Sequence, residues 1–454
     1  MSIMDFSGKR VLVLGAGISG RSAAVAIAQH GGTVLLNDAK LQDIAEEPWK
    51  GFTELGIQCV FGTQDISLLA DVDIVVPSPV ISLDMDILQE AKKRHMLIWS
   101  EVDVACQLTN ATILGVTGTN GKTTTTTLLG EMIKAAGRQT VVGGNIGIGL
   151  SEHVMDLPNT AVVVAELSSF QLECTHFLHA KGATVLNITP DHLERHHTME
   201  AYAAAKERIF QNQEKTDAAV LNYDDTRVRE MAAHVVGQVY YFSTEGPVPE
   251  GAFYENNQLV IRHNGADMVI CQADTLPLLG KHNIQNYLAA TVLALVAGVP
   301  LDTIRQVIMN FSGVEHRLEK VRVIHGVPYY NDSKGTNVDA SIKALEAFSG
   351  NLILIAGGHD KMTSLDEFMK LVKEKVDTLL LIGEASSRFA QAAQAAGVKD
   401  IRLMGNSMER AIMEARSIAK APQAVVLSPA CSSFDMYDNY EQRGRVFKGI
   451  VNAL

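Results

Sequence analysis

The chain has 454 residues, of which 47% are hydrophobic and 20% are charged, so its composition is that of a soluble globular protein and its length exceeds one typical domain of about 150 residues. Its 39 Lys and Arg residues against 51 Asp and Glu residues give a net charge of −12, which argues against nucleic acid or an anionic membrane as the main partner. The five cysteines are far apart and form no C-x-x-C motif, so we expect a reducing, cytoplasmic location without disulfides or a thiolate metal site.

Three series of short β-branched runs alternate with helical patterns along the chain. They begin at RVLVLGAG, at ATILGVTG and after GVEHRLEKV. Such alternation predicts βαβ units and parallel sheets. We therefore predict an α/β fold with three domains, residues 1–107, 108–313 and 314–454. Within the middle domain, residues 240–275 are expected to form antiparallel strands. The N-terminus has no apolar signal segment and no apolar run approaches about 18 residues, so neither secretion nor membrane insertion is expected.

A glycine-rich turn, GAGISG at 15–20, follows the first predicted strand and opens a helix, and Asp38 ends the next strand. This arrangement is typical of a Rossmann-like domain that binds a nucleotide diphosphate at a helix N-terminus. An alternative is that the small residues only let the helix pack close to the strand. We favour a nucleotide diphosphate site, which the pattern does not restrict to NAD.

A second glycine-rich loop, TGTNGKTT at 117–124, follows an apolar run, with Val116 where the usual phosphate loop has its first glycine. Its glycines allow the backbone to wrap phosphate oxygens, Lys122 can reach the β- and γ-phosphates, and Thr123 can offer a hydroxyl to Mg²⁺. The alternative is a glycine turn with an incidental lysine. Glu166, at the end of AVVVAE, is either the carboxylate for this Mg²⁺ or a solvated acid at a strand end.

Histidines and one lysine follow in the same predicted domain. His192 and His196 are four residues apart, but Leu193 stands where a zinc protease has its glutamate, so that class is not expected. His192 follows a strand and can face the phosphate site, whereas His196 and His197 are expected at the surface. Lys206 lies on an alanine-rich helix, where a lysine is typically a surface residue.

Further motifs extend along nearly the whole chain. Together with TGTNGKTT at 117–124 they are GGNIG at 143–147, ELSSFQL at 166–172, NITPDHLERH at 187–196, YAAAK at 202–206, GKHNIQN at 280–286, EHRLE at 315–319, NDSKGTN at 331–337, GGHDK at 357–361 and SPACSSFD at 428–435. This set of motifs resembles that of the Mur ligases. The loop TGTNGK[ST] is this superfamily's own form of the phosphate loop, shared with folylpolyglutamate synthetases, and this explains Val116.

The resemblance is greatest to the members that add D-glutamate. It implies a central P-loop ATPase-type domain, a C-terminal Rossmann-like domain, and ATP-driven amide formation through an acyl phosphate in peptidoglycan synthesis. The implied substrates are UDP-N-acetylmuramoyl-L-alanine and D-glutamate, the cofactors are ATP and two Mg²⁺ ions, and the enzyme is expected to be a cytoplasmic monomer. By the resemblance, ATP is bound by Gly118, Thr119, Asn120, Gly121, Lys122, Thr123, Thr124, Thr125, Asn283, Arg317 and Asp332.

The resemblance also implies the remaining site residues. Lys122, His192 and Lys206 are the expected catalytic residues, and Mg²⁺ is expected on Thr123, Glu166, His192 and a carbamylated Lys206, which reverses the surface interpretation of that lysine. The UDP-substrate is expected to contact Ser19, Asp38, Lys40, Ser78, Asn145 and Gln171. D-glutamate is expected to contact Lys334, Thr336, Lys361, Ser433, Phe434 and Tyr440.

One position departs from the family pattern. The family's S-P-G loop reads Ser78-Pro79-Val80 here, and Val80 lacks the freedom of glycine at positive φ. Two functions of other classes compete with the ligase: a nicotinamide-dependent dehydrogenase built on GAGISG and Asp38, and a non-enzymatic nucleotide switch. A dehydrogenase would give no role to the phosphate loop or to the third predicted domain. A nucleotide switch would give no role to the glycine-rich turn at 15–20.

Overall fold

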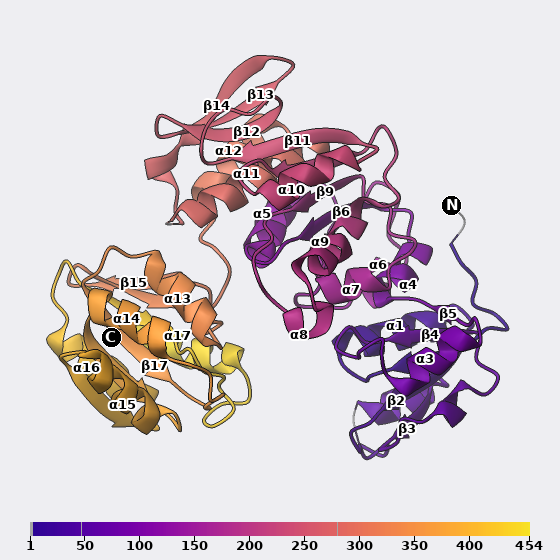
Figure 1. The fold of residues 1–454 in the computed structure, drawn as a ribbon, viewed down its shortest axis with the longest axis horizontal. Helices are drawn as coiled ribbons and strands as arrows, with labels where there is room; N and C mark the ends of the chain where they lie inside the picture. The colour runs from indigo at the N-terminus through magenta and orange to yellow at the C-terminus, as the bar shows by residue number, and fades with distance from the viewer. Residues whose placement is uncertain (1–2, 47, 279) are drawn as a thin grey trace. The chain divides into compact units, whose positions relative to one another are not determined.

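The computed structural model describes residues 3–46, 48–278 and 280–454, and Figure 1 labels many of their helices and strands. The chain divides into two compact units. The first unit holds the described residues up to Leu276 and Lys281–Asn310. The second unit holds the described residues from Pro277 to Gly280 and Phe311–Leu454. Three sheets with helices between their strands confirm the predicted α/β fold.

The first sheet has the order β3-β2-β1-β4-β5, and all its strand pairs are parallel. The central strands β1 and β4 are almost completely buried, as expected for a parallel sheet covered by helices. The elements of this region are β1 Arg10–Leu14, α1 Ile18–Gln29, β2 Thr33–Asp38, α2 Trp49–Glu54, β3 Gln58–Phe61, β4 Ile74–Pro77, α3 Asp86–Lys93, β5 Leu97–Ile98 and α4 Glu101–Gln107.

The second sheet has the order β14-β13-β12-β11-β10-β9-β6-β8-β7. The pairs among strands β6 to β12 are parallel. Strands β12, β13 and β14 pair antiparallel, as expected for residues 240–275. The strands are β6 Thr112–Thr117, β7 Thr140–Gly144, β8 Val162–Glu166, β9 Gly182–Val185, β10 Ala218–Asn222, β11 Gln238–Ser243, β12 Gly251–Glu255, β13 Gln258–His263 and β14 Ala266–Gln272.

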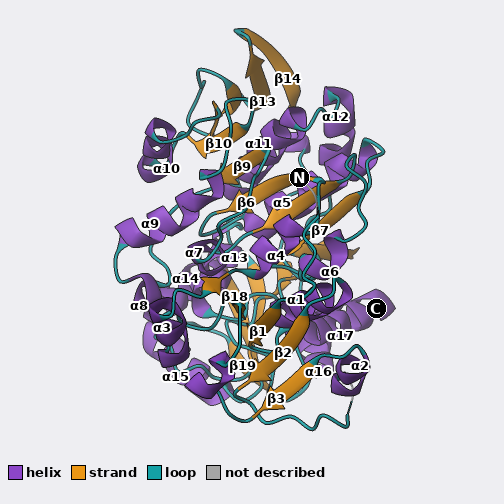
Figure 2. Ribbon diagram, turned by 90° about the vertical axis from the view of Figure 1, so that its right-hand side faces the viewer, coloured by secondary structure: helices purple, strands orange, loops and turns teal. Residues whose placement is uncertain are grey.

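Two long helices pack together on this second sheet, α5 Lys122–Ala135 and α11 Lys281–Val296. Figure 2 shows the helices of this region against the strands. The shorter helices are α6 Ser151–Val154, α7 Ser169–Glu173, α8 Leu193–His196, α9 Met199–Glu207, α10 Thr226–Glu230 and α12 Leu301–Asn310.

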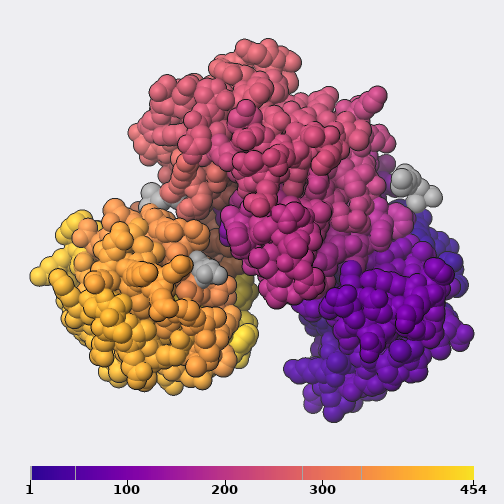
Figure 3. All heavy atoms as spheres, viewed as in Figure 1, coloured from indigo at the N-terminus to yellow at the C-terminus, as the bar shows by residue number. Residues whose placement is uncertain are grey.

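The third sheet has the order β15-β16-β20-β17-β18-β19, with β15 antiparallel to β16 and the other pairs parallel. Separate hydrophobic clusters on its two faces show that helices cover both, and Figure 3 shows this part of the chain, orange to yellow, as a rounded body. The elements are β15 Glu319–Ile324, β16 Val327–Asn331, α13 Val338–Glu346, β17 Leu352–Gly357, α14 Asp366–Lys375, β18 Val376–Ile382, α15 Ser386–Ala396, β19 Ile401–Gly405, α16 Met408–Ile418, β20 Ala424–Leu427 and α17 Tyr440–Ala453.

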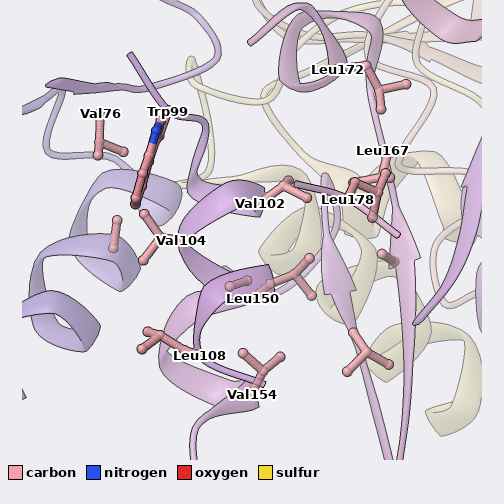
Figure 4. Packing of buried hydrophobic residues seen from close by; sticks show 14 of the residues in the cluster. Val76, Trp99, Val102, Val104, Leu108, Leu150, Val154, Leu167, Leu172 and Leu178 are labelled. Atoms are coloured by element: carbon pink, nitrogen blue, oxygen red, sulfur yellow. The ribbon is translucent and has the colours of Figure 1, made fainter. Parts of the chain in front are cut away.

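One hydrophobic cluster runs continuously from the first sheet to the second. Figure 4 shows part of it, where Trp99 and Val104 lie near one end and Leu150, Leu167 and Leu178 continue it. The predicted boundary at 107 falls at the last residue of α4, inside this packed region, and the boundaries at 107 and 313 stay predictions. Within the described residues, no helix is both long enough and apolar enough to cross a bilayer.

Candidate active site

The phosphate loop lies between β6 and α5 and needs glycine at two positions. Gly118 has φ of 148° and Gly121, the N-cap of α5, has φ of 84°. A Cβ on Gly121 would lie 2.3 Å from Asn286 Oδ1, and one on Gly118 would lie 2.9 Å from Leu186 Cβ. The loop is therefore fixed by backbone conformation and by close packing, as a turn that presents its amides to an anion requires.

Side chains outside the loop hold it in place. The Asn120 amide donates to Asn187 Oδ1 at 2.8 Å, and Asn187 Nδ2 donates to the Asn120 carbonyl at 3.1 Å. The Thr119 hydroxyl lies 3.2 Å from the Tyr202 hydroxyl and accepts from the Thr189 amide at 3.1 Å. The segment after β9 and helix α9 thus keep the loop rigid.

Two lysines meet at one carbonyl of this loop. Lys122 Nζ donates to the carbonyls of Gly118 at 2.9 Å and Thr119 at 2.8 Å, and Lys206 Nζ donates to the Gly118 carbonyl at 2.9 Å. Lys206 is only 1% exposed, and its Nζ lies 4.5 Å from the centre of the Tyr202 ring. The surface position expected from residue types alone is therefore wrong: α9 turns Lys206 inward, onto the phosphate loop.

Burial, reinforced by the charge of Lys122, lowers the pKa of Lys206 to about 6. An ammonium group removed from water and placed beside another cation loses its proton more easily. This lowering of the pKa of Lys206 favours the neutral amine over the ammonium. A neutral amine is the nucleophilic form of lysine.

Glu166 ends β8 beside β6, where it is in register with Val116. It is 1% exposed, so it is not a solvated acid at a strand end. Its Oε1 accepts from Asn145 Nδ2 at 2.8 Å, while its buried Oε2 has no hydrogen-bond partner among the described residues. A buried carboxylate oxygen without a donor fits a cation. Thr123, buried in the first turn of α5, follows the neighbouring strand β6.

The two histidines of the next loop differ in their surroundings. His192 is exposed, has φ of 52°, and its ring nitrogens lie 3.5 Å from carboxylate oxygens of Asp191 and Glu194. His196 is buried, with Nε2 3.0 Å from the Ser169 hydroxyl, and burial lowers its pKa. The surface position expected for His196 is therefore wrong, because the turn after His192 directs it into the protein. His197 is exposed, as expected.

The first glycine turn shows the close packing considered for it, and nucleotide binding there stays a prediction. A Cβ on Gly20 would lie 1.8 Å from the Gly15 carbonyl oxygen, so this glycine is required for packing of α1. A Cβ on Gly17 would have open space within 4 Å. The turn therefore packs tightly at one glycine and leaves its backbone accessible at another.

Asp38 organises the same edge of the first sheet. Its Oδ2 accepts from the Ala16 amide at 2.8 Å and its Oδ1 from the Lys40 amide at 2.9 Å. Ser78 is buried after β4, with its amide bonded to the Leu14 carbonyl at 2.7 Å. Ser19 and Lys40 lie at the same edge, because one begins α1 and the other follows β2. Four predicted UDP contacts thus share the carboxyl edge of one sheet.

Val80 does not cause the strain expected from its replacement of a glycine. Its φ is not positive, and its side chain is 81% exposed. The loop is held instead through its backbone, since Arg195 donates to the carbonyls of Pro79 at 2.8 Å and Ile81 at 3.2 Å. Gln171 caps α7 by accepting from the Ser168 amide at 3.0 Å.

The third sheet gathers its predicted residues at the carboxyl edge, in the loops after β16, β17 and β20. The His359 amide donates to the Ser432 carbonyl at 3.0 Å, which joins the loop of Lys361 to that of Ser433 and Phe434. Ligand sites in doubly wound sheets lie at this edge.

Arg443 joins the loop of Lys334 and Thr336 to the loop of Ser433. It is 0% exposed; its Nε donates to the Ser333 hydroxyl at 2.9 Å and its Nη1 to the Cys431 and Ser432 carbonyls at 3.1 and 3.2 Å. Burial lowers its pKa to about 10. Tyr440 begins the same helix, and its carbonyl accepts from the Ser333 hydroxyl at 2.8 Å. A buried arginine thus fixes two loops by their backbones.

Lys361 is exposed, but the residues around it are fixed. Arg388 forms a two-pronged ion pair with Asp360, with distances of 2.6 and 2.7 Å, and donates to the Thr363 carbonyl at 3.1 Å. Phe434 is 72% exposed. The loop of Lys361 is therefore held by its neighbours, while Lys361 and Phe434, two of the predicted D-glutamate contacts, face solvent.

The three remaining predicted ATP residues belong to different units. Asn283 is buried in the first unit and accepts from Asn286 Nδ2 at 3.1 Å, and Asn286 contacts the Thr125 hydroxyl at 3.2 Å. In the second unit Asp332 is buried and accepts from the Ser428 hydroxyl at 2.7 Å. Burial raises the pKa of Asp332 to about 7, opposed by that hydrogen bond and by the charge of Arg317.

Known protein families and characterised relatives match most of this chain. Residues 116–294 match the Mur ligase middle domain, and residues 316–431 match the Mur ligase glutamate ligase domain. UDP-N-acetylmuramoylalanine–D-glutamate ligase of Lachnoclostridium phytofermentans is 41% identical over 99% of both chains. The enzyme of the same name from Pelotomaculum thermopropionicum is 42% identical over 100% of this chain and 99% of its own.

The chain belongs to the Mur ligase family. The fold agrees with this assignment. The structure of UDP-N-acetylmuramate-alanine ligase from Thermotoga maritima matches with a TM-score of 0.59 and 19% identity, covering 98% of this chain and 99% of the other. At that identity the likeness concerns the fold.

Several residues that shape this Mur ligase's site were not predicted from the sequence. Asn187, Arg195 and Asn286 lie inside quoted motifs, and their positions beside other site residues were the available signal. Tyr202 lies four residues before Lys206, on the same helix face. The backbone carbonyls that Arg195 and Arg443 bind could not be read from any local pattern.

Proposed function

We infer that this Mur ligase joins D-glutamate to UDP-N-acetylmuramoyl-L-alanine at the expense of ATP, a step of peptidoglycan synthesis. The observation that carries this conclusion is the identity of 41–42% over nearly the whole length of enzymes with that name. The phosphate loop, with Lys122 and Lys206 on one carbonyl and Glu166 nearby in the sheet, supports ATP as the co-substrate.

In the first step, an oxygen of the L-alanyl carboxylate attacks the γ-phosphorus of ATP. A P–O bond to this oxygen forms as the bond to the β-phosphate oxygen breaks, giving an acyl phosphate and ADP. Phosphoryl transfer depends mainly on positioning and on neutralising charge. We assign phosphate binding to Lys122 and to the amides of Gly118, Thr119, Asn120, Gly121, Thr123, Thr124 and Thr125. Asn283, Arg317 and Asp332 are assigned to the rest of ATP.

We assign one Mg²⁺ ion to Thr123 and Glu166 and a second to His192 and Lys206. The bound ions would neutralise charge on the phosphates. The unpartnered Oε2 of Glu166 matches the first assignment. Lys206 fits only after its neutral amine has formed a carbamate with CO₂ and lost a proton, because an ammonium would repel a cation. Its pKa of about 6 favours the amine that this reaction needs.

In the second step, the amine nitrogen of D-glutamate attacks the acyl carbon. The C–N bond forms, the C–O bond to phosphate breaks, phosphate leaves, and the nitrogen loses a proton. We assign the carboxylates of D-glutamate to Lys334, Thr336, Lys361 and Ser433, with Phe434 and Tyr440 against its carbon chain. Ser19, Asp38, Lys40 and Ser78 are assigned to the UDP group, and Asn145 and Gln171 to the muramoyl-alanine part.

Phosphate release tests the function directly. The protein is incubated with ATP, Mg²⁺ and UDP-N-acetylmuramoyl-L-alanine, and the amino acid is varied among D-glutamate, L-glutamate, L-alanine and meso-diaminopimelate. We expect release that depends on D-glutamate, with a product heavier than the nucleotide substrate by one glutamyl residue. Equal release with the other amino acids, or none with any, would overturn the proposal. Oxidation of NADH in the same mixture would revive the dehydrogenase.

We also propose that the protein acts as a monomer in the cytoplasm, where ATP is available. A monomer has a mass of 49.1 kDa. Light scattering during size-exclusion chromatography should give this mass, and twice this mass would show a dimer.

A further inference from the structure

Arg195 connects the second sheet to the substrate loop of the first. It lies in α8, three residues after His192. Its Nη1 donates to the Pro79 carbonyl at 2.8 Å, and its Nη2 donates to the Ile81 carbonyl at 3.2 Å. These two carbonyls belong to the residues on either side of Val80, and Pro79 directly follows Ser78 in the sequence. One guanidinium group therefore holds the backbone of the loop that carries a proposed UDP-substrate contact.

The guanidinium is itself held on its other side. Its Nε and Nη2 donate to Glu173 Oε2 at 3.1 and 2.7 Å, and its central carbon lies 4.2 Å from the centre of the Phe170 ring. The other oxygen of Glu173 lies 3.2 Å from His196 Nδ1. Glu173 and Phe170 belong to α7, the helix that also carries Gln171. The planar fork of arginine suits such simultaneous contacts, and lysine cannot reproduce them.

The contacts of Arg195 surround a small cavity in the first unit. Ser78, Phe170, Gln171 and Arg195 are among the residues that line it. Two of these, Ser78 and Gln171, are proposed contacts of the UDP-substrate, one from each sheet. Arg195 therefore contacts both the loop that carries Ser78 and the helix that carries Gln171.

We propose that Arg195 is a positioning residue for the UDP-substrate, acting through the 79–81 backbone to set Ser78 against Gln171. This inference rests on the proposed ligase function and adds a residue to it. Arg195 is not assigned a contact with ATP or with D-glutamate. Its loss should therefore weaken binding of one substrate and leave the other two unchanged.

The test compares Arg195→Lys and Glu173→Gln with a matched control, Arg208→Lys. Arg208 also donates to two carbonyls near α7, those of Leu172 at 2.8 Å and Thr175 at 2.6 Å, and both belong to the second sheet's region. For Arg195→Lys we expect the KM for UDP-N-acetylmuramoyl-L-alanine to rise at least about tenfold. This is the lower end of the affinity loss expected when one charge-assisted hydrogen bond is removed. The KM values for ATP and D-glutamate should stay within about twofold.

Glu173→Gln should shift the same KM in the same direction, and the double variant should be no worse than the more affected single variant, because the two side chains act as a unit. Arg208→Lys should leave all three KM values unchanged. Calorimetric titration of the UDP-substrate should show the same loss of affinity. Glu173→Gln also keeps the test valid if Arg195→Lys unfolds below the assay temperature.

An unchanged KM for the UDP-substrate in both variants would overturn the inference, as would equal shifts in all three KM values or an equal shift in Arg208→Lys. Failure of the proposed function looks different: the wild-type protein would release no phosphate in response to D-glutamate, and this would overturn both proposals. Wild-type release with unchanged variant KM values would overturn only the role of Arg195.

Discussion

The phosphate site, formed by residues 117–125, Glu166 and Lys206, and the third-sheet site, formed by the loops after β16, β17 and β20, are both built at the carboxyl ends of parallel strands. They differ in the burial of their charged groups. Lys206 and Glu166 are almost completely buried, whereas Lys361 is exposed and its loop is held by a neighbouring ion pair. The buried charges of the third-sheet region, Arg443 and Asp332, bind other protein groups.

This difference follows the chemistry assigned to each site. Burial of a charge costs free energy, and it changes the pKa of the group. The carbamate proposed for Lys206 requires that effect, because a lysine with an ordinary pKa would stay protonated and would not form a carbamate. The D-glutamate proposed to bind at the third-sheet site is a dicarboxylate, for which a protonated lysine in contact with water is suitable. Buried groups in the third-sheet region serve to fix the loops.

The largest effect is expected at the phosphate site. Lys122→Ala should reduce D-glutamate-dependent phosphate release by roughly a hundred- to a thousandfold, the range for loss of one preorganised charge-stabilising group. The fold should persist, because Lys122 bonds to loop carbonyls and is not part of the hydrophobic core. Release is measured at saturating substrates. The control is Lys134→Ala, an exposed lysine on the same helix; normal turnover by a folded Lys122→Ala variant would remove the loop from the mechanism.

Lys206→Ala should reduce activity by at least roughly ten- to a hundredfold. Mutation of residues that only hydrogen-bond to metal ligands already lowers activity by that amount. Acetate or formate should restore part of it by supplying the missing carboxylate. The pKa of Lys206 lies near 6, below its ordinary value, so the neutral amine dominates above that pH and the ammonium below it. Carbamate-dependent activity is therefore present above pH 6 and lost as the pH falls through it.

The measurement for Lys206 is the pH dependence of turnover in the wild type and in the acetate-rescued variant. The acidic limb near pH 6 should be weaker in the rescued variant, which has no amine to protonate. Labelled bicarbonate should give a carbamate signal in carbon-13 spectra of the wild type alone. Full activity of the variant without any added acid would return Lys206 to a structural role.

Much of the fold and of the phosphate site is predictable from local sequence. Alternating apolar runs predicted the three α/β blocks, and the spacing of Gly118, Gly121 and Lys122 predicted a phosphate loop. The direction of Lys206 was not predictable from residue types, because Ala203, Ala204 and Ala205 give its helix no marked apolar face. The resemblance to a family supplied that residue, and the structure shows it buried on the loop.

Contacts between distant segments were the part that local sequence could not supply. Arg195 binds carbonyls more than a hundred residues before it, and Arg443 joins loops that begin about 110 and 12 residues before it. Carbonyl acceptors exist at every residue, so no residue type identifies them as partners. His196 was misplaced for the same reason, since its partners Ser169 and Glu173 lie on another element.

A smaller and more selective effect is expected at the third-sheet site. Lys361→Ala should raise the KM for D-glutamate at least about tenfold, because one charge-assisted contact with a carboxylate is lost. The KM for the UDP-substrate should be nearly unchanged. Lys370→Ala, an exposed lysine on α14, is the control. A shift in the nucleotide-substrate KM alone, or none at all, would show that D-glutamate binds elsewhere.

Asp360→Asn refines this prediction, since it removes the charge that holds Arg388 but leaves Lys361 in place. We expect a rise of about two- to fivefold in the same KM, less than the loss of the direct contact. An effect larger than that of Lys361→Ala would mean that the ion pair, and not the lysine, dominates binding.

The smallest effect concerns Asp332, and it appears in stability. Burial raises the pKa of Asp332 to about 7, above the roughly 3.9 of an unfolded chain. The folded protein therefore binds a proton that the unfolded chain has lost between these values, and the contribution of Asp332 to the free energy of unfolding falls as pH rises through this window. Asp332→Asn removes the charge while its amide oxygen can still accept from the Leu318 amide, at 3.2 Å in the wild type.

The variant should therefore unfold at a temperature about 2–4 °C above the wild type at pH 8, the shift expected for about 1 kcal/mol in a domain of this size. At pH 5, where the wild-type carboxyl is protonated in the folded protein and the lower end of this window is near, the difference should be clearly smaller. Activity should fall in the variant, because the same residue is assigned to ATP. Scanning calorimetry of both proteins at the two pH values provides the measurement. A variant less stable than the wild type at pH 8 would show that the buried carboxylate is stabilised by its hydrogen bonds and by Arg317 more than burial disfavours it.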